Sequence, residues 1–196
     1  MTRLAHRAAR RRLGAWLLAA AGCALLGAAP CAAEAQAGAA SLERSVKAAF
    51  LYKFLGYAEF PASAFADANA PVVIGVVGAD EMAAELSRIV AGRSVDNRAV
   101  LVKTLREGEA PAGVHLLFVA GADSARVARV LKAAQPSPIL LVTESENGLQ
   151  LGSVINFKIV DERVRFDVSL DAADKNNIKL SSRLLTVANH VQKGAP

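Results

Sequence analysis

The sequence has few of the residues that support covalent or metal-dependent chemistry. It contains two cysteines, one tryptophan and three histidines in 196 residues. Cys23, Cys31 and Trp16 all lie in the first 37 residues, so the remainder of the chain has no thiol. Beyond Ala37, this excludes a scaffold held by disulfides and a zinc site built on cysteine.

Acidic residues are absent from the start of the chain. Met1 to Arg12 contains five arginines, and Leu13 to Ala33 carries no charged side chain. A basic segment followed by an apolar one is typical of a signal peptide, and Ala35-Gln36-Ala37 fits its cleavage sequence. We predict a signal peptide over residues 1–37, cleaved near Ala37, and a mature exported domain over residues 38–196. An uncleaved membrane anchor and a lipoprotein attached at Cys23 are the weaker alternatives.

The mature part also lacks an excess of charge. Loss of residues 1–37 changes the count of basic and acidic residues from 23 and 18 to 18 and 17, a net charge of +1. Nucleic-acid binding requires a clustered basic face, so this composition argues against DNA or RNA as a partner.

The mature part is long enough to bury a single core, roughly 70% of its unfolded surface. Apolar residues at steps of three and four predict a helix over 42–57, which Pro61 ends. Continuous β-branched runs such as 71–78 indicate strands covered on both faces. We expect strands over 71–78, 99–104, 114–120 and 139–143, with helices over 80–91 and 124–134. The alternation predicts an α/β fold with a layered mixed, largely parallel β-sheet flanked by helices.

The last quarter of the chain has a different pattern. Apolar and polar residues alternate over 154–160 and 164–170 around Asp161-Glu162, which predicts a C-terminal β-hairpin. Ile155, Phe157 and Ile159 would share a face with residues 164, 166 and 168 of the second strand. We expect Asp171 to open a helical segment and a final helix to cover 180–191.

No catalytic motif is present at a recognisable spacing. Gly75 to Gly78 is neither a dinucleotide fingerprint nor a P-loop and fits an ordinary turn between strand and helix. Ser124 lacks the surroundings of a nucleophile elbow and is interpreted as a helix cap, while Asp80 is expected to cap the preceding helix.

The remaining titratable residues also favour structural roles. We interpret His115 and His190 as structural, on a buried strand and on the last helix. The acid pairs Glu144/Glu146 and Asp171/Asp174 fit polar loops or helix starts better than general acid–base work. We therefore expect no enzyme activity, no catalytic residues, no cofactor and no metal.

Two stretches of the mature part resemble the YfiR-like family. The first is Val46-Lys-Ala-Ala-Phe-Leu-Tyr-Lys-Phe54, followed by Glu59-Phe60-Pro61. The second comprises Ile155-Asn-Phe157, Val164-Arg-Phe-Asp-Val168 and Ile178-Lys-Leu-Ser-Ser-Arg-Leu-Leu185. The resemblance covers nearly all of the mature part, and its two signatures lie at opposite ends.

The resemblance implies a periplasmic repressor. Such a protein binds the periplasmic sensor domain of an inner-membrane diguanylate cyclase, lowers cyclic-di-GMP signalling and so limits biofilm formation. It also implies an outer-membrane lipoprotein partner that sequesters the repressor, and a homodimer. The best-described relatives carry disulfides linked to redox control, whereas this mature part has no cysteine, so redox control is not expected.

Four residues are candidates for contact with the partner. Tyr52 lies off the apolar stripe of its helix, and tyrosine is enriched in interfaces. Arg165, Lys179 and Arg183 would form a polar patch near the hairpin and the last helix, unless they are solvated surface charges. An alternative function is a periplasmic small-molecule-binding sensor module, with the ligand at the carboxyl ends of the parallel strands.

Overall fold

The computed structural model describes residues 29–135 and 137–193. The chain divides into two compact units, 1–40 and 41–196, and the fold described below is that of the second. Most of the predicted signal peptide, residues 1–28, lies outside the described residues. The predicted cleavage site at Ala37 falls within the first helix, α1 (Ala29–Leu55).

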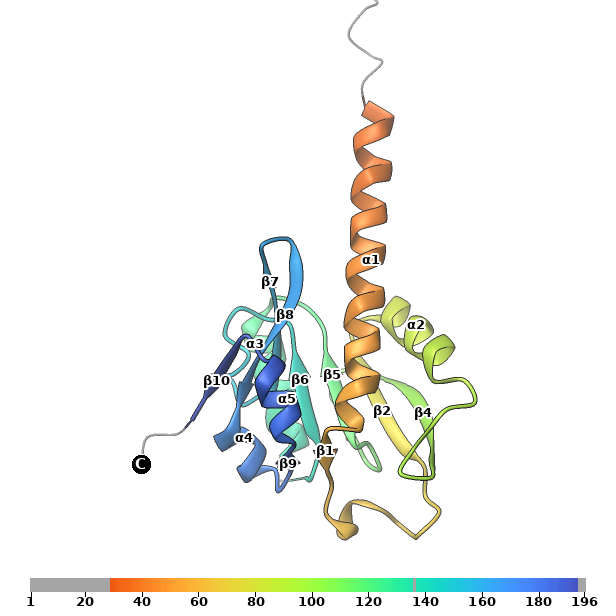
Figure 1. The fold of residues 1–196 in the computed structure, drawn as a ribbon, viewed down its shortest axis with the longest axis vertical. Coiled ribbons are helices and arrows are strands. Elements are labelled where there is room, and N and C mark those ends of the chain that lie inside the picture. Colours follow the sequence, from red (N-terminus) through yellow and green to blue (C-terminus); the bar gives the residue numbers. More distant parts are fainter. Residues whose placement is uncertain (1–28, 136, 194–196) are drawn as a thin grey trace, which may run out of the picture. The chain divides into compact units, whose positions relative to one another are not determined.

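The second unit is built on an eight-stranded mixed sheet with the order β10-β8-β7-β6-β5-β2-β4-β3 (Figure 1). The strands β4, β2, β5, β6 and β7 are parallel, whereas β3 runs antiparallel to β4, β8 runs antiparallel to β7, and β10 runs parallel to β8. Their bounds are β2 (Val72–Val77), β3 (Ser94–Val95), β4 (Arg98–Leu105), β5 (Leu116–Val119), β6 (Leu140–Thr143), β7 (Ile155–Val160), β8 (Arg163–Ser169) and β10 (His190–Gln192). The predicted fold class is confirmed. A separate two-stranded sheet pairs β1 (Ala58–Glu59) with β9 (Lys179–Leu180).

Helices cover both faces of the large sheet. They are α1, α2 (Asp80–Val90), α3 (Ser124–Ala134), α4 (Leu170–Lys175) and α5 (Ser182–Val187), and a short 3-10 helix spans Ala62–Ala64. The part of α1 from Ser41 on lies beside α2, since Ser45 Oγ donates to Glu85 Oε1 at 3.1 Å. Phe54 of this helix stacks on Phe157, 5.8 Å between ring centroids.

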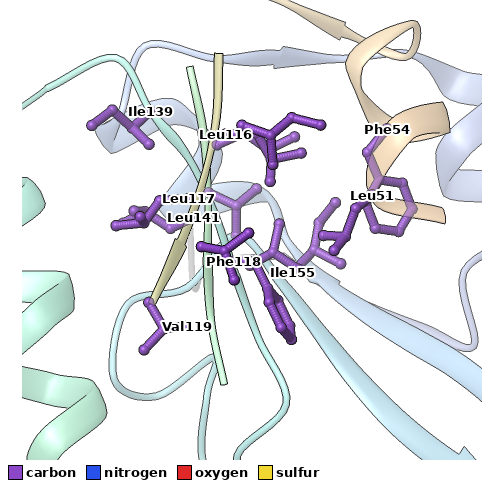
Figure 2. Packing of buried hydrophobic residues seen from close by; sticks show 14 of the residues in the cluster. Leu51, Phe54, Leu116, Leu117, Phe118, Val119, Ile139, Leu141 and Ile155 are labelled. Carbon is purple, nitrogen blue, oxygen red and sulfur yellow. The ribbon is translucent and has the colours of Figure 1, made fainter. Parts of the chain in front are cut away.

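The core has two layers, one on each side of the central strands. Leu51 and Phe54 of α1 lie on the same side as Phe118 and Ile155, as Figure 2 shows. Leu117 and Leu141 point to the opposite side, because successive side chains of a strand alternate between faces (Figure 2). There α3 contributes its own buried stripe of Val127, Leu131 and Ala134. Burial on both faces explains why β5 and β6 read as continuous apolar runs.

The predicted hairpin is confirmed in register. Phe157 pairs with Phe166 and Ile155 with Val168, so the apolar residues of the two strands share a face. Asp161 and Glu162 form the two-residue loop and both have positive φ, 48° and 58°. A loop of two residues with this backbone matches the twist of the strands that it joins.

Two capping predictions are wrong. Asp123, and not Ser124, caps α3, because its carboxylate accepts from the backbone N–H groups of Ala125 and Arg126. Asp80 is the first residue of α2, and its N-cap, Ala79, has no side-chain hydrogen bond. An acid in the first turn still favours the helix through the helix dipole.

The predicted final helix over 180–191 is also wrong. Only Ser182–Val187 is helical, and His190–Gln192 forms the strand β10 beside β8. Asn189 holds this strand in place: its backbone N–H donates to Phe166 O at 2.9 Å and its Nδ2 to Asp167 Oδ1 at 2.8 Å. Helical spacing of apolar residues is thus overridden by pairing with a sheet edge.

Candidate functional site

The order of the parallel strands creates one position where open α/β sheets usually bind ligands. From β2 the chain crosses to β4 on one side, and β5 and β6 then follow on the other. Ligands bind at such a reversal, outside the carboxyl ends of the strands. Here Gly78 follows β2 and Gly121 lies two residues beyond β5. The carboxyl ends of β2, β5 and β6, called the strand edge below, are therefore the place to look for a small-molecule site.

Arg126 of α3 fills that position. Its Nη1 donates to the carbonyl of Ala120 at 2.6 Å, and its guanidinium forms an ion pair with Glu107. The same guanidinium lies against Gly78, so close that a Cβ at residue 78 would collide with it. Gly78 also has φ +78°, a conformation that other residues rarely adopt. The turn after β2 thus receives a side chain of this protein.

A partly buried ion pair closes the neighbouring part of the edge. Lys47 of α1 is 8% exposed, and its Nζ lies 2.7 Å from Glu144 Oε2, just after β6. Glu43, one turn earlier in α1, also pairs with Lys47. The other oxygen of Glu144 accepts from the backbone N–H of Gly121 at 3.1 Å. Together these contacts join α1 to the ends of β5 and β6.

The charge state of Lys47 follows from this arrangement. Burial by itself would lower the pKa of Lys47, but hydrogen bonds to Glu144 and Glu43, together with their negative charges, outweigh burial and raise it. Lys47 is therefore a cation at neutral pH, held between two carboxylates. A ligand at this edge would have to displace either this network or Arg126.

Open space remains beside the edge. A pocket of about 260 Å³ lies next to Arg126, with Leu105, Leu117 and Val130 among its apolar lining residues and Arg129 among its polar ones. Among residues 36–135 and 137–193, no group of three or more His, Cys, Asp or Glu side chains is placed to hold a metal ion.

His115 lies at the other end of β5, in an aromatic cluster. Its Nδ1 accepts from the backbone N–H of Val73 at 3.1 Å, and its ring stacks on Phe65 at 4.4 Å. The guanidinium of Arg98 lies over the same phenyl ring, 3.9 Å from its centroid. Burial lowers the pKa of His115, with the charge of Arg98 acting in the same direction and the backbone of Ala64 in the opposite one. The neutral ring therefore serves as a fixed acceptor, a structural role.

The four predicted contact residues are spread over different elements. Tyr52 is half-buried against the core, and Arg93 lies over its ring at 5.3 Å. Arg165 is exposed on β8, opposite Lys158 of β7. Lys179 and Arg183 are exposed on β9 and α5.

Lys179 and Arg183 lie near each other in the sequence, on β9 and α5, whereas Arg165 lies on β8. Lys179 pairs across the small sheet with Glu59, whereas Arg165 belongs to the large sheet. In the described part of the chain, no hydrogen bond or ion pair joins any two of the four. The sequence pattern missed Lys47 and Arg126 because their partners, Glu144 and Glu107, are 97 and 19 residues away.

Comparison with known proteins identifies the family. The YfiR/HmsC-like family model matches residues 44–189, so the chain belongs to the YfiR/HmsC-like family. The chain is also similar to the crystal structure of a conserved domain protein from Vibrio cholerae O1 biovar eltor, at 10% identity and a TM-score of 0.47. That alignment covers 61% of this chain and 54% of the other, so the chain spans about half the length of this relative. No curated protein matches the chain.

Within the described residues, no helix has both the length and the apolar character needed to cross a membrane.

Proposed function

We propose that this protein is a periplasmic regulator that binds the sensor domain of an inner-membrane diguanylate cyclase and represses it. Repression would lower cyclic-di-GMP and limit biofilm formation. The protein itself would carry out no chemical reaction. The observation that carries the proposal is the family match over residues 44–189, which includes every strand of the large sheet except β10 and all of its covering helices except the part of α1 before Arg44.

The side-chain contacts at the strand edge favour a regulator over a small-molecule sensor. The position where α/β sheets usually hold a ligand is occupied by Arg126 and by the Lys47–Glu144 pair. A sensor module would need these groups to move on binding. A protein that acts through its outer surface needs them in place, because they fix α1 and α3 against the sheet.

Repression of this kind requires the regulator to prefer one state of its target. A bound protein shifts an equilibrium only by its difference in affinity for the two states. The regulator would bind the inactive arrangement of the cyclase sensor domain more tightly than the active one. An outer-membrane lipoprotein that competes for the same protein would reverse the shift, and the proposal includes that partner and a homodimer of the regulator.

The proposal is tested by deleting the gene and measuring cyclic-di-GMP by mass spectrometry. We expect the nucleotide level and biofilm mass to rise, and both to return to normal when the gene is restored on a plasmid. Equal cyclic-di-GMP in the deleted and restored strains, across several growth conditions, would reject the link to a cyclase.

A further inference from the structure

The β7–β8 hairpin carries a cluster of cations on one face. Side chains of a strand alternate between faces, so the register that directs Phe157 and Phe166 into the core directs Lys158 and Arg165 to the opposite face. Val160 and Arg163, which pair next to the loop, lie on that face as well. We define the basic face of the hairpin as Lys158, Arg163 and Arg165, all of which are exposed.

Among the described side chains, only Lys158 of this face forms an ion pair, although the exposed acids Asp161 and Glu162 lie in the loop next to Arg163. Lys158 Nζ lies 2.7 Å from Asp167 Oδ2, and this aspartate is buried and also accepts from Asn189. Arg163 and Arg165 form no ion pair with any residue among 36–135 and 137–193. Two guanidinium groups therefore lie on the same side of one strand, and neither is held by an ion pair with those residues.

The backbone beside these arginines is also without a partner. The strand β10 pairs with β8 only from Asp167 to Ser169, and β8 is bordered on its other side by β7. Among the described residues, the outer edge of β8 at Arg163, Val164 and Arg165 has no neighbouring strand. Exposed edges of this kind offer free N–H and C=O groups to another chain.

The positive charge of the basic face limits which partners can bind there. A second copy docked through the same face would bring cations against cations, because a two-fold interface places each patch against itself. A small anion would need an enclosed site, and the pocket next to Arg126 is lined by other residues. The guanidinium group of arginine instead forms two parallel hydrogen bonds with a carboxylate. Carboxylates on another protein would steer its association with this face and fix the orientation of the complex.

We propose that the basic face of the hairpin is the docking surface for an acidic surface of the partner protein. The inference rests on the proposed function and adds the place and the charge of the contact. Lys158 orients the face through its pair with Asp167, and Arg163 and Arg165 contact the carboxylates of the partner.

The test compares two double variants in the strain that lacks the gene. Arg163→Glu with Arg165→Glu reverses two charges on the basic face. Lys132→Glu with Lys175→Glu makes the same charge change at two exposed lysines of α3 and α4 that form no ion pair in the described part of the chain. Thermal midpoints and periplasmic amounts are measured for each variant, and the readouts are cyclic-di-GMP and binding of the labelled protein to spheroplasts.

We expect the hairpin variant to leave cyclic-di-GMP near the level of the deletion, and the control variant to restore repression. Loss of two exposed charge pairs should weaken binding to spheroplasts about ten-fold. Full repression by a well-folded hairpin variant would overturn the inference while leaving the proposed function intact. If deletion itself leaves the nucleotide unchanged, the proposed function fails first.

A protease treatment separates a protein partner from the lipid surface. Digesting the outer face of the spheroplasts should abolish binding that depends on Arg163 and Arg165. Binding that survives digestion and still requires the two arginines would assign the basic face to anionic lipid and overturn the proposal.

Discussion

Replacement of Lys47 by methionine tests how strongly the ion-pair network holds α1 to the sheet. The substitution keeps the unbranched apolar part of the side chain but removes the ammonium group and so leaves Glu43 and Glu144 without their cation. Removing one partner of a fully buried pair costs about 3–5 kcal/mol. The side chain of Lys47 is 10% exposed and that of Glu144 is 23% exposed, so solvent can rehydrate part of the freed charge.

We therefore expect a loss of about 2–3 kcal/mol in the free energy of unfolding. For a domain of this size, that loss corresponds to a fall in the melting temperature of about 4–12 °C. The measurement is equilibrium unfolding in urea, with Lys53→Met as the matched control, because Lys53 is exposed on the same helix and forms no ion pair among the described residues.

The pH dependence provides an independent check. The folded pKa of Lys47 is raised, so the stability that the network supplies is complete below the ordinary value of 10.5 and is lost as pH rises through the folded pKa. The methionine variant should lack this alkaline loss. A double variant with Glu144→Gln should cost less than the sum of the two single changes. A Lys47→Met protein as stable as Lys53→Met would refute the reasoning.

Three further changes probe other parts of the fold. Gly78→Ala should destabilise the protein by about 1–3 kcal/mol in urea unfolding, because φ is positive at residue 78 and the added methyl group collides with Arg126. Adding Arg126→Ala removes the collision and should restore part of the lost stability. His115→Phe removes the acceptor for the N–H of Val73 and should cost about 1–3 kcal/mol near pH 7.5. Because the pKa of His115 is lowered, its contribution is present above 6.5 and declines as pH falls below that value, so the variant should lose less stability on acidification than the wild type. Phe54→Ala should cost about 3–5 kcal/mol in the same assay, and a loss below 1 kcal/mol would contradict the assigned packing of α1.

The sequence predicts the inner strands of the sheet better than its edge strand β10. Residues 71–78 and 139–143 are recognisable as strands because both of their faces are buried and nearly every residue is apolar. The hairpin is recognisable because apolar and polar residues alternate in its sequence, although both of its faces are buried near the sheet, where Asn156 and Asp167 lie. The strand β10 could not be predicted, since its three residues become a strand only by contact with β8 and with Asp167.

The candidate site illustrates a different limit. A turn such as Gly75 to Gly78 resembles many turns between strand and helix, and nothing near it in the sequence shows that Arg126 occupies the space beside it. The Lys47–Glu144 pair likewise joins residues that only the folded sheet brings together. Arg165 could be chosen from the sequence as an exposed cation, but its neighbours Lys158 and Arg163 emerge as one face only from the hairpin register.

The central claim is that the protein acts by binding a membrane cyclase and favouring its inactive state. It is tested most directly by adding the purified exported protein to detergent-solubilised membranes of the deletion strain and measuring conversion of GTP to cyclic-di-GMP. The account predicts that synthesis falls in a saturable manner as wild-type protein is added, and that the Arg163→Glu, Arg165→Glu variant requires more protein for the same effect. Unchanged synthesis at the highest protein concentration, in membranes with active cyclase, would contradict it.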